Sequence, residues 1–317
     1  MRILFISSNR IGDAVLTTGL LAHLERTCPD AHFTVVCGPV AADLFRAVPR
    51  LEALIVLKKK KHHAHWFDLW KRCVTTRWDL IVDLRNSAVT RLLFAKRKIY
   101  KKAHASGRHK VEDHADAMKL SPPPSPLLWI DAPAAAKAAA KMPHDVPVLA
   151  LGPSANWPPK QWPIESFIEL AKRLTAEGAI LAGAKILIVA APHERDQVTP
   201  LMNAFPKDLI IDGVGYDLLT VAAFLQRAKL FVGNDSGLMH MASAVGTPTL
   251  GLFGPGFENI YGPWGKHTAF VRTPESAATL LARLPDPAAF EPRLMDSLSV
   301  DTVVEAAEAL LQSELQS

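Results

Sequence analysis

The first 120 residues alternate short apolar runs with longer amphipathic stretches. The apolar runs are rich in Val, Ile, Leu and Phe, which is typical of strands, and the amphipathic stretches have apolar positions three or four residues apart, which is typical of helices. The expected strands are 2–7, 33–37, 53–57 and 80–84, and the expected helices are 13–26, 40–47 and 66–77. Repeated strand–helix units of this kind predict a parallel, doubly wound sheet.

The same alternation continues in the second half of the chain. The expected strands are 148–152, 185–190, 209–211, 230–233 and 249–253, and the expected helices are 164–177, 194–204, 217–228 and 237–245. A second doubly wound sheet is therefore predicted. The fold class is α/β, with two Rossmann-like parallel-sheet domains that face a cleft.

A proline-rich segment separates the two halves. Residues 121–126 contain four prolines and fit neither a helix nor an inner strand, and an Ala-rich helix is expected at 134–142. The length of 317 residues is about twice the usual size of one domain. We expect an N-terminal domain with its linker at 1–145, a C-terminal domain at 146–298 and a final amphipathic helix at 299–317.

The composition is that of a globular protein in a reducing compartment. Hydrophobic residues make up 49% of the chain and charged residues 21%, which excludes a disordered chain. The three cysteines form no C-x-x-C pair, so free thiols are expected and a structural metal is not. The N-terminus has no signal-peptide pattern and no apolar run is long enough to cross a membrane. We expect a cytosolic protein that at most lies on a membrane surface.

Charge is distributed unevenly along the chain. Residues 1–120 contain 22 Lys and Arg against 11 Asp and Glu, whereas residues 121–317 contain 14 against 20. Two basic runs hold much of the excess, and they are Lys58, Lys59, Lys60 and Lys61, and Lys96, Arg97 and Lys98. A basic half favours an anionic partner, such as nucleic acid, a phosphorylated glycolipid or an anionic leaflet. A merely solvated surface is the alternative.

The loops that follow strands are the places to look for a ligand site, because ligands of open parallel sheets bind beyond the carboxyl ends of the strands. The loop at 7–13 has a single glycine and no G-x-G-x-x-G pattern, so a dinucleotide site is not expected there. It places Asp13 at the start of a helix. Asp13 is either a catalytic carboxylate or a residue that only complements the helix dipole.

The loop at 152–163 is stiff, because it contains two Trp and four Pro. Its one cation, Lys160, precedes a helix and suits the binding of a phosphate. Ser154 lies in the same loop and is a second candidate for donor binding. The alternative is that the loop packs a hinge and that Lys160 is solvated.

Two further loops offer polar side chains at helix starts. In one of them, Asp235 or Ser236 can cap a helix while the amides of Ser236 and Gly237 face a pyrophosphate. His240 follows one turn later and is either a ligand contact or a packed histidine. In the other loop, Glu194 can accept hydrogen bonds from ribose hydroxyls or can be an ordinary residue of a helix start.

Taken together, these motifs resemble the bacterial heptosyltransferase family. The motifs are I-G-D-x-x-x-T at 11–17, K-x-W-P at 160–163, and D-S-G-x-x-H with the later G-T-P and L-F-G-P at 235–255. The family comprises GT-B glycosyltransferases that transfer heptose from ADP-heptose to the inner core of lipopolysaccharide. The chain departs from the family at Gly19 and Gly256, where Pro and Thr are frequent.

The resemblance implies an inverting transfer with Asp13 as the general base. It implies that Lys160 binds the donor phosphates, that Glu194 contacts the ribose, and that the donor sugar and pyrophosphate meet Asp235, Ser236 and Gly237. No metal or cofactor is needed, since the nucleotide sugar is a substrate. The expected partners are an ADP-sugar donor and a phosphorylated, Kdo-bearing glycolipid acceptor held by the two basic runs at the inner face of the inner membrane. A monomer that binds no nucleic acid is expected.

Three alternatives stay open. The first alternative is a different nucleotide-activated sugar as donor, because Gly256 lacks a hydroxyl near the donor site. A nucleotide-sugar 2-epimerase uses the same architecture, although it has no need of a basic first domain. A nucleic-acid-binding protein would use the basic half, although the basic runs lack the interleaved aromatic residues that stack on bases.

Overall fold

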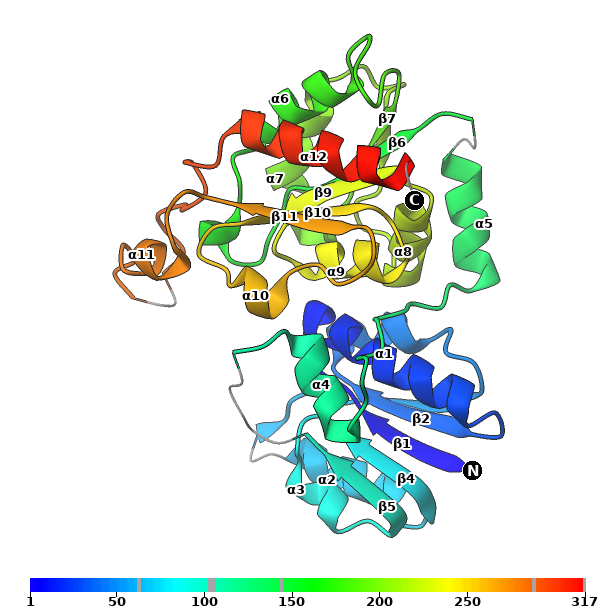
Figure 1. Cartoon of the computed structure of the whole chain (residues 1–317). Helices are drawn as coiled ribbons and strands as arrows, with labels where there is room; N and C mark the ends of the chain where they lie inside the picture. Colours follow the sequence, from blue (N-terminus) through cyan, green and yellow to red (C-terminus); the bar gives the residue numbers. More distant parts are fainter. Residues whose placement is uncertain (62–63, 102–106, 143–144, 287–288, 316–317) are drawn as a thin grey trace. The chain divides into compact units, whose positions relative to one another are not determined.

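The computed structural model describes residues 1–61, 64–101, 107–142, 145–286 and 289–315. The chain divides into two compact units, Met1–Trp129 and Ile130–Ser317, and each is described by itself (Figure 1). The second unit includes helix α5 (Ala132–Lys141), because α5 packs against helix α8 (Leu218–Gln226). The division expected at residue 145 assigns this helix to the first domain instead.

The first unit contains, within its described residues, a sheet of five parallel strands in the order β3-β2-β1-β4-β5. The strands are β1 (Arg2–Ile6), β2 (His32–Cys37), β3 (Leu51–Val56), β4 (Trp78–Asp83) and β5 (Ala95–Tyr100). The four strands expected from the sequence are therefore confirmed. Strand β1 is central, and the chain winds outward from it in both directions, so β1 and β4 flank the switch point of the sheet.

Helices cover both faces of this sheet. Helices α1 (Ile11–Thr27) and α4 (Lys110–Met118) pack against each other on one face, and α2 (Ala64–Cys73) and α3 (Ala88–Arg91) lie on the other (Figure 1). The helix expected at 40–47 is a short 3-10 helix, η1 (Pro39–Phe45). Helix α4 was not predicted.

Strand β5 was also missed, because its sequence AKRKIY carries three consecutive cations and lacks an apolar run. The strand lies at an edge of the sheet and pairs only with β4, so Lys96 and Arg97 point to solvent. Lys96 forms an ion pair of 2.6 Å with Asp79 on the neighbouring strand. Charged side chains are tolerated on an edge strand, where they discourage pairing with another chain.

The segment that leaves the first unit lies directly on helix α1. A Cβ atom at Gly19 would be 2.3 Å from the carbonyl oxygen of Pro124 and 2.8 Å from that of Ser125. The backbone N–H of Leu127 also donates to the Thr18 hydroxyl at 3.0 Å. Glycine at position 19 is therefore required for this close approach of two backbones.

The second unit contains, again within the described residues, a sheet of six parallel strands in the order β11-β10-β9-β6-β7-β8. The strands are β6 (Val148–Gly152), β7 (Lys185–Ile188), β8 (Ile210–Asp212), β9 (Leu230–Asn234), β10 (Thr249–Phe253) and β11 (Thr268–Arg272). The edge strand β11 was not predicted. The switch point of this sheet lies between β6 and β9.

The helices of the second unit agree with the periodicity to within a few residues, and they are α6 (Ile164–Thr175), α7 (Arg195–Asn203), α8, α9 (Gly237–Ala244) and α12 (Val300–Leu315). A short 3-10 helix, η4 (Pro192–Glu194), precedes α7. The short helices α10 (Glu258–Tyr261) and α11 (Ala277–Leu281) were not predicted.

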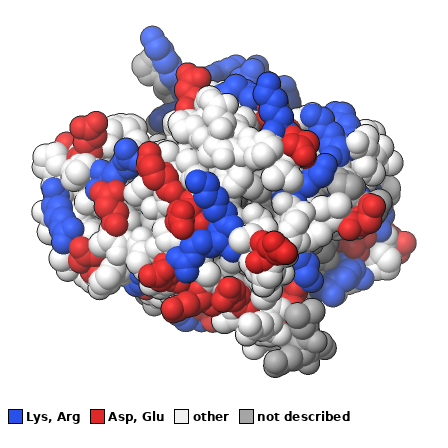
Figure 2. Space-filling model, turned by 90° about the horizontal axis from the view of Figure 1, so that it is seen from above, with Lys and Arg blue, Asp and Glu red and all other residues white. Residues whose placement is uncertain are grey.

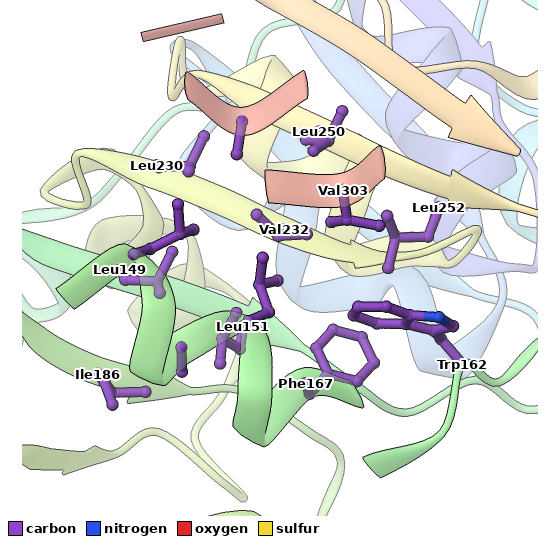
Figure 3. Packing of buried hydrophobic residues seen from close by; sticks show 14 of the residues in the cluster. Leu149, Leu151, Trp162, Phe167, Ile186, Leu230, Val232, Leu250, Leu252 and Val303 are labelled. Carbon is purple, nitrogen blue, oxygen red and sulfur yellow. The ribbon is translucent and has the colours of Figure 1, made fainter. Parts of the chain in front are cut away.

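The core of the second unit lies between the sheet and helices α6 and α12 (Figure 3). Leu151 and Val232 from the central strands meet Phe167 of α6 and Val303 of α12. Trp162 is 2% exposed and packs edge-on against Phe167, with 5.0 Å between the ring centroids. Side chains of this size each contribute about 1.5 to 3 kcal/mol when fully buried, so the loop that carries Trp162 is held firmly to the core.

Three further observations complete the description of the chain. Cys28, Cys37 and Cys73 are free thiols, as predicted. Among the described residues, no helix is long and apolar enough to span a membrane. On the face seen in Figure 2, basic and acidic side chains lie near one another with wide uncharged areas between them.

Candidate functional site

The first candidate loop follows the central strand β1. Helix α1 begins at Ile11, two residues earlier than expected, and Asp13 lies half-buried in its first turn. The Ser7 and Thr17 hydroxyls are 2.8 Å apart and Thr17 donates to the Ala14 carbonyl at 2.7 Å, which ties the end of β1 to the helix. The Asp13 carboxylate forms no ion pair with the described residues.

The two basic runs lie at opposite edges of the first sheet. Lys58, Lys59, Lys60 and Lys61 follow β3, whereas Lys96, Arg97 and Lys98 belong to β5. Two of these cations already have acidic partners, since Lys60 donates to Asp68 at 2.7 Å and Lys96 pairs with Asp79. The runs therefore do not form one continuous patch, and neither follows the central strand.

A buried histidine lies near the end of β5. His114 in α4 is 5% exposed and its Nδ1 atom has no hydrogen-bond partner. Burial, with a smaller contribution from the nearby Lys101, lowers the pKa of His114 to about 3. His114 is therefore neutral in the folded protein at neutral pH.

This histidine predicts a pH-dependent stability. Below pH 6.5 the unfolded chain protonates His114 while the folded chain keeps it neutral, so the free energy of unfolding should fall by about 2 kcal/mol between pH 6.5 and 5. The stabilisation is complete above pH 6.5. Chemical denaturation of wild type and His114→Leu at pH 6.5 and pH 5 measures this change in the free energy of unfolding. An equal loss of stability in the two proteins would contradict it.

In the second unit, a buried amide joins the loops that follow β6 and β9 at the switch point. Asn234 is fully buried, accepts from the backbone N–H of Trp162 at 3.1 Å and donates to the Pro153 carbonyl at 2.7 Å. The Trp162 indole N–H donates to the Leu298 carbonyl at 2.8 Å. The stiff loop at 152–163 is thus fixed at several points.

This loop brings two of the expected site residues together. The Lys160 ammonium donates a hydrogen bond to Asp235 Oδ2, and the Asp235 side chain is 8% exposed. A Cβ atom at Gly256 would be 2.6 Å from the same carboxylate oxygen. Glycine at position 256 therefore leaves room for the carboxylate in this ion pair.

Two other expected residues also meet. The Ser154 hydroxyl donates to Glu194 Oε2 at 2.8 Å, and the backbone N–H of Ala191 donates to the same oxygen at 2.8 Å. Glu194 is 8% exposed and lies beyond the end of β7. Its Oε1 atom makes no hydrogen bond with the described residues, so it can accept one from a ligand.

The start of helix α9 offers several hydrogen-bond donors. Ser236 is the N-cap residue, its side chain makes no capping bond, and its hydroxyl oxygen is buried without a partner. The first backbone amides of the helix, from Gly237 onward, have no intrahelical acceptor. His240 lies buried one turn further along the same helix. Unpaired amides at a helix start favour an anion such as a diphosphate.

The structure therefore brings Lys160 to Asp235 and Ser154 to Glu194, on the two sides of one switch point. Among the described residues, no group of acidic, His or Cys side chains could hold a metal ion. Sequence reasoning missed Asn234, although its place immediately before Asp235 at a strand end is a recognisable signal.

Comparison with known proteins identifies relatives for most of the chain. The model of glycosyltransferase family 9 (heptosyltransferase) matches residues 84–283. Lipopolysaccharide heptosyltransferase 3 of Escherichia coli is 25% identical over 308 residues, which cover 81% of this chain and 84% of that protein. Lipopolysaccharide heptosyltransferase 1 of Pseudomonas aeruginosa is 25% identical over 300 residues, with coverage of 83% and 82%.

Solved structures show the same fold. A glycosyltransferase of family 9 from Veillonella parvula has a TM-score of 0.78 at 20% identity and covers 98% of this chain and 97% of its own. The ADP-heptose heptosyltransferase II of E. coli has a TM-score of 0.76 at 20% identity and covers 99% of both chains. The predicted pair of doubly wound sheets, the GT-B architecture, is confirmed. Because the family model matches more than half of its length, the chain belongs to glycosyltransferase family 9, the heptosyltransferases, and is a glycosyltransferase.

Proposed function

We propose that this enzyme transfers heptose from ADP-heptose to an inner-core acceptor of lipopolysaccharide. The observation that carries the proposal is the meeting of Lys160, Asp235 and the first amides of α9 at the switch point of the second sheet, in a chain of this family. The curated relatives are named as lipopolysaccharide heptosyltransferases. One solved relative, a heptosyltransferase of E. coli, holds an ADP-heptose analogue.

On the donor side, Lys160 exchanges its partner Asp235 for the diphosphate of the donor. The amides of Ser236 and Gly237 add hydrogen bonds to the phosphate oxygens, and together these groups stabilise the charge that develops on the leaving ADP. Asp235, released from Lys160, accepts a hydrogen bond from a hydroxyl of the donor sugar. Glu194 accepts a hydrogen bond from a ribose hydroxyl through its unused oxygen.

On the acceptor side, Asp13 acts as the general base. The acceptor hydroxyl attacks the anomeric carbon, its proton passes to the Asp13 carboxylate, and the bond between the anomeric carbon and the phosphate oxygen breaks. Attack from the face opposite ADP inverts the anomeric configuration. The half-buried position of Asp13, free of any ion pair with the described residues, suits a base of this kind.

An assay of ADP release tests the proposal. Purified enzyme is given ADP-heptose and a panel of inner-core acceptors, and product formation should require both substrates. Transfer from a different nucleotide sugar but not from ADP-heptose would replace the proposed donor. Interconversion of the nucleotide sugar without any acceptor would indicate an epimerase and overturn the proposal.

We also propose that the first unit contacts the anionic inner face of the membrane that carries the acceptor. The exposed apolar side chains of this unit include Phe67 (55%), Leu92 (69%) and Phe94 (70%). Lys71 lies over the Phe67 ring, 4.6 Å from its centre. Exposed aromatic and aliphatic side chains beside cations are typical of a surface that binds a bilayer.

If the first unit binds an anionic membrane, removal of the basic runs should weaken that binding. Replacing Lys58–Lys61 by Gln, or Lys96, Arg97 and Lys98 by Gln, should reduce binding to anionic vesicles by at least about tenfold, since each cation near such a surface contributes roughly 1 kcal/mol. The difference from wild type should shrink as salt is added. Acceptor KM should rise as well. Vesicle sedimentation and steady-state kinetics measure these effects.

A control variant replaces three exposed lysines of the second unit by Gln, and they are Lys172, Lys207 and Lys266. It should bind vesicles as wild type does. If the two basic-run variants behave like this control at low salt, the basic runs are a solvated surface.

A further inference from the structure

A cation that belongs to neither basic run, Arg85, lies at the switch point of the first sheet. Arg85 lies two residues beyond the end of β4, and its Nη1 atom donates to the Asn9 side chain at 3.0 Å. Asn9 belongs to the loop between β1 and α1, the loop that leads to Asp13. The hydrogen bond from Arg85 to Asn9 therefore joins the two loops on either side of the switch point.

Neighbouring groups hold Arg85 in place. Its backbone N–H donates to Asp83 Oδ1 at 2.9 Å, and Asp83 is fully buried at the end of β4, where Thr90 donates to its other oxygen at 2.8 Å. The guanidinium lies over the indole of Trp66, 4.9 Å from the ring centre. The side chain is thus oriented by its own strand end and by an aromatic face.

The guanidinium keeps most of its hydrogen-bonding capacity. It has five N–H donors, and among the described residues one of them is used, for Asn9, while no carboxylate lies within 4 Å. The side chain is only half-buried. An arginine that is oriented, partly desolvated and without an acidic partner suits the bidentate binding of a phosphate or carboxylate.

A second cation, Lys101, lies beyond the carboxyl ends of the strands, as Arg85 does. Lys101 follows the end of β5, and its backbone N–H donates to the Asp83 carbonyl at 3.1 Å. The side chain is half-buried, and burial and the nearby Lys110 lower the pKa of Lys101, while Asp113 and Asp13 oppose the shift. The hydrogen bond to Asp83 holds the Lys101 backbone at the end of β4, the strand next to β1, whose following loop leads to Asp13. Lys101 forms no ion pair within the described part of the chain.

We infer that Arg85 and Lys101 form a subsite that binds an anionic group of the acceptor next to Asp13. The inference rests on the proposed function. It adds which part of the acceptor the enzyme recognises, namely an anionic group. Binding a phosphate or carboxylate of the acceptor here would place a neighbouring hydroxyl at the base. The two basic runs cannot do this together, because β3 and β5 lie at opposite edges of the sheet.

The test is Arg85→Gln in the full-length enzyme, with Arg77→Gln as a matched control. Arg77 is exposed and precedes β4, so the two arginines flank the same strand at opposite ends. Arg85→Gln should raise the KM for a phosphorylated acceptor by about tenfold to a hundredfold and change kcat by less than about threefold, the loss expected for a charge-assisted contact. Arg77→Gln should leave both constants unchanged, and donor KM should not move in either variant.

Acceptors with and without their phosphate, and with the carboxylate replaced by an amide, identify the anionic group. Whichever group the subsite binds, its removal should raise KM in wild type and raise it less in Arg85→Gln, where Lys101 alone remains to bind that group. Arg85→Lys, which keeps the charge but loses the fork of donors, should give an intermediate KM. Should Arg85→Gln fail to fold, Lys101→Gln provides the same comparison.

Two results would overturn the inference. One is an acceptor KM for Arg85→Gln within twofold of wild type, and the other is an undiminished preference of that variant for the charged acceptor. Failure of the proposed function is distinguishable, because the wild-type enzyme would then release no ADP from ADP-heptose with any acceptor.

Discussion

Asp13→Asn should lower turnover by about a hundredfold or more while folding and ADP-heptose binding stay nearly intact. The amide has the shape of the carboxylate and lacks only its basicity, and general base catalysis typically contributes factors of about 10² to 10⁴. Since Asp13 forms no ion pair with the described residues, its neutralisation leaves no cation unpaired. Steady-state kinetics at saturating acceptor, with calorimetry of donor binding, measures both quantities.

Asp30→Asn is the control for this experiment, because Asp30 is exposed and lies beyond the other end of helix α1. It should turn over as wild type does. A turnover of Asp13→Asn within threefold of wild type would exclude Asp13 as the base.

Lys160→Ala should weaken ADP binding by about 1.5 to 3 kcal/mol, the usual contribution of a charge-assisted contact to phosphate, and should slow transfer. The structure adds a second effect. Without Lys160, the Asp235 carboxylate, which is 8% exposed, loses its cation and repels the phosphates. Isothermal calorimetry with ADP gives the change in affinity, and thermal unfolding reports the cost of the unpaired carboxylate.

The double variant Lys160→Ala/Asp235→Asn separates these two effects. It should recover stability, because the buried charge is removed, but it should not recover ADP affinity. An unchanged ADP affinity in Lys160→Ala alone would mean that the loop at 152–163 has only a structural role.

The central strands and the edge strands β3 and β8 could be predicted from the sequence, whereas the edge strands β5 and β11 could not. Strands β1 and β6 are covered on both faces, so they must be almost wholly apolar, and that run is visible in the sequence. Strand β5 pairs on one side only, and its exposed positions hold Lys96 and Arg97. Strand β11 also pairs on one side only, and its apolar run of three residues lies between Thr268 and Arg272. Where an apolar run is missing or this short, periodicity alone cannot distinguish a strand from a loop.

The candidate site was predictable where neighbouring residues form a motif and not where distant loops meet. The loops that carry Lys160 and Asp235 could be named because each follows a predicted strand. Their ion pair joins residues 75 positions apart, and the hydrogen bond of Arg85 to Asn9 joins residues 76 apart. Such contacts depend on which strands are neighbours in the sheet, and the local sequence pattern does not reveal the strand order. The two basic runs illustrate the same point. Their similar charge suggests one common surface, but strand order places β3 and β5 at opposite edges of the sheet.

The contact at Gly19 means that helix α1 and the segment at 121–126 cannot be changed independently of each other. Helix α1 holds Asp13 in its first turn, and less than two turns later Gly19 lies against the carbonyls of Pro124 and Ser125. Any larger residue at position 19 would have to move either the helix or the segment at 121–126. Exchange of position 19 with a relative is therefore tolerated only when the relative's connecting segment is exchanged with it, and the two should be grafted as one unit.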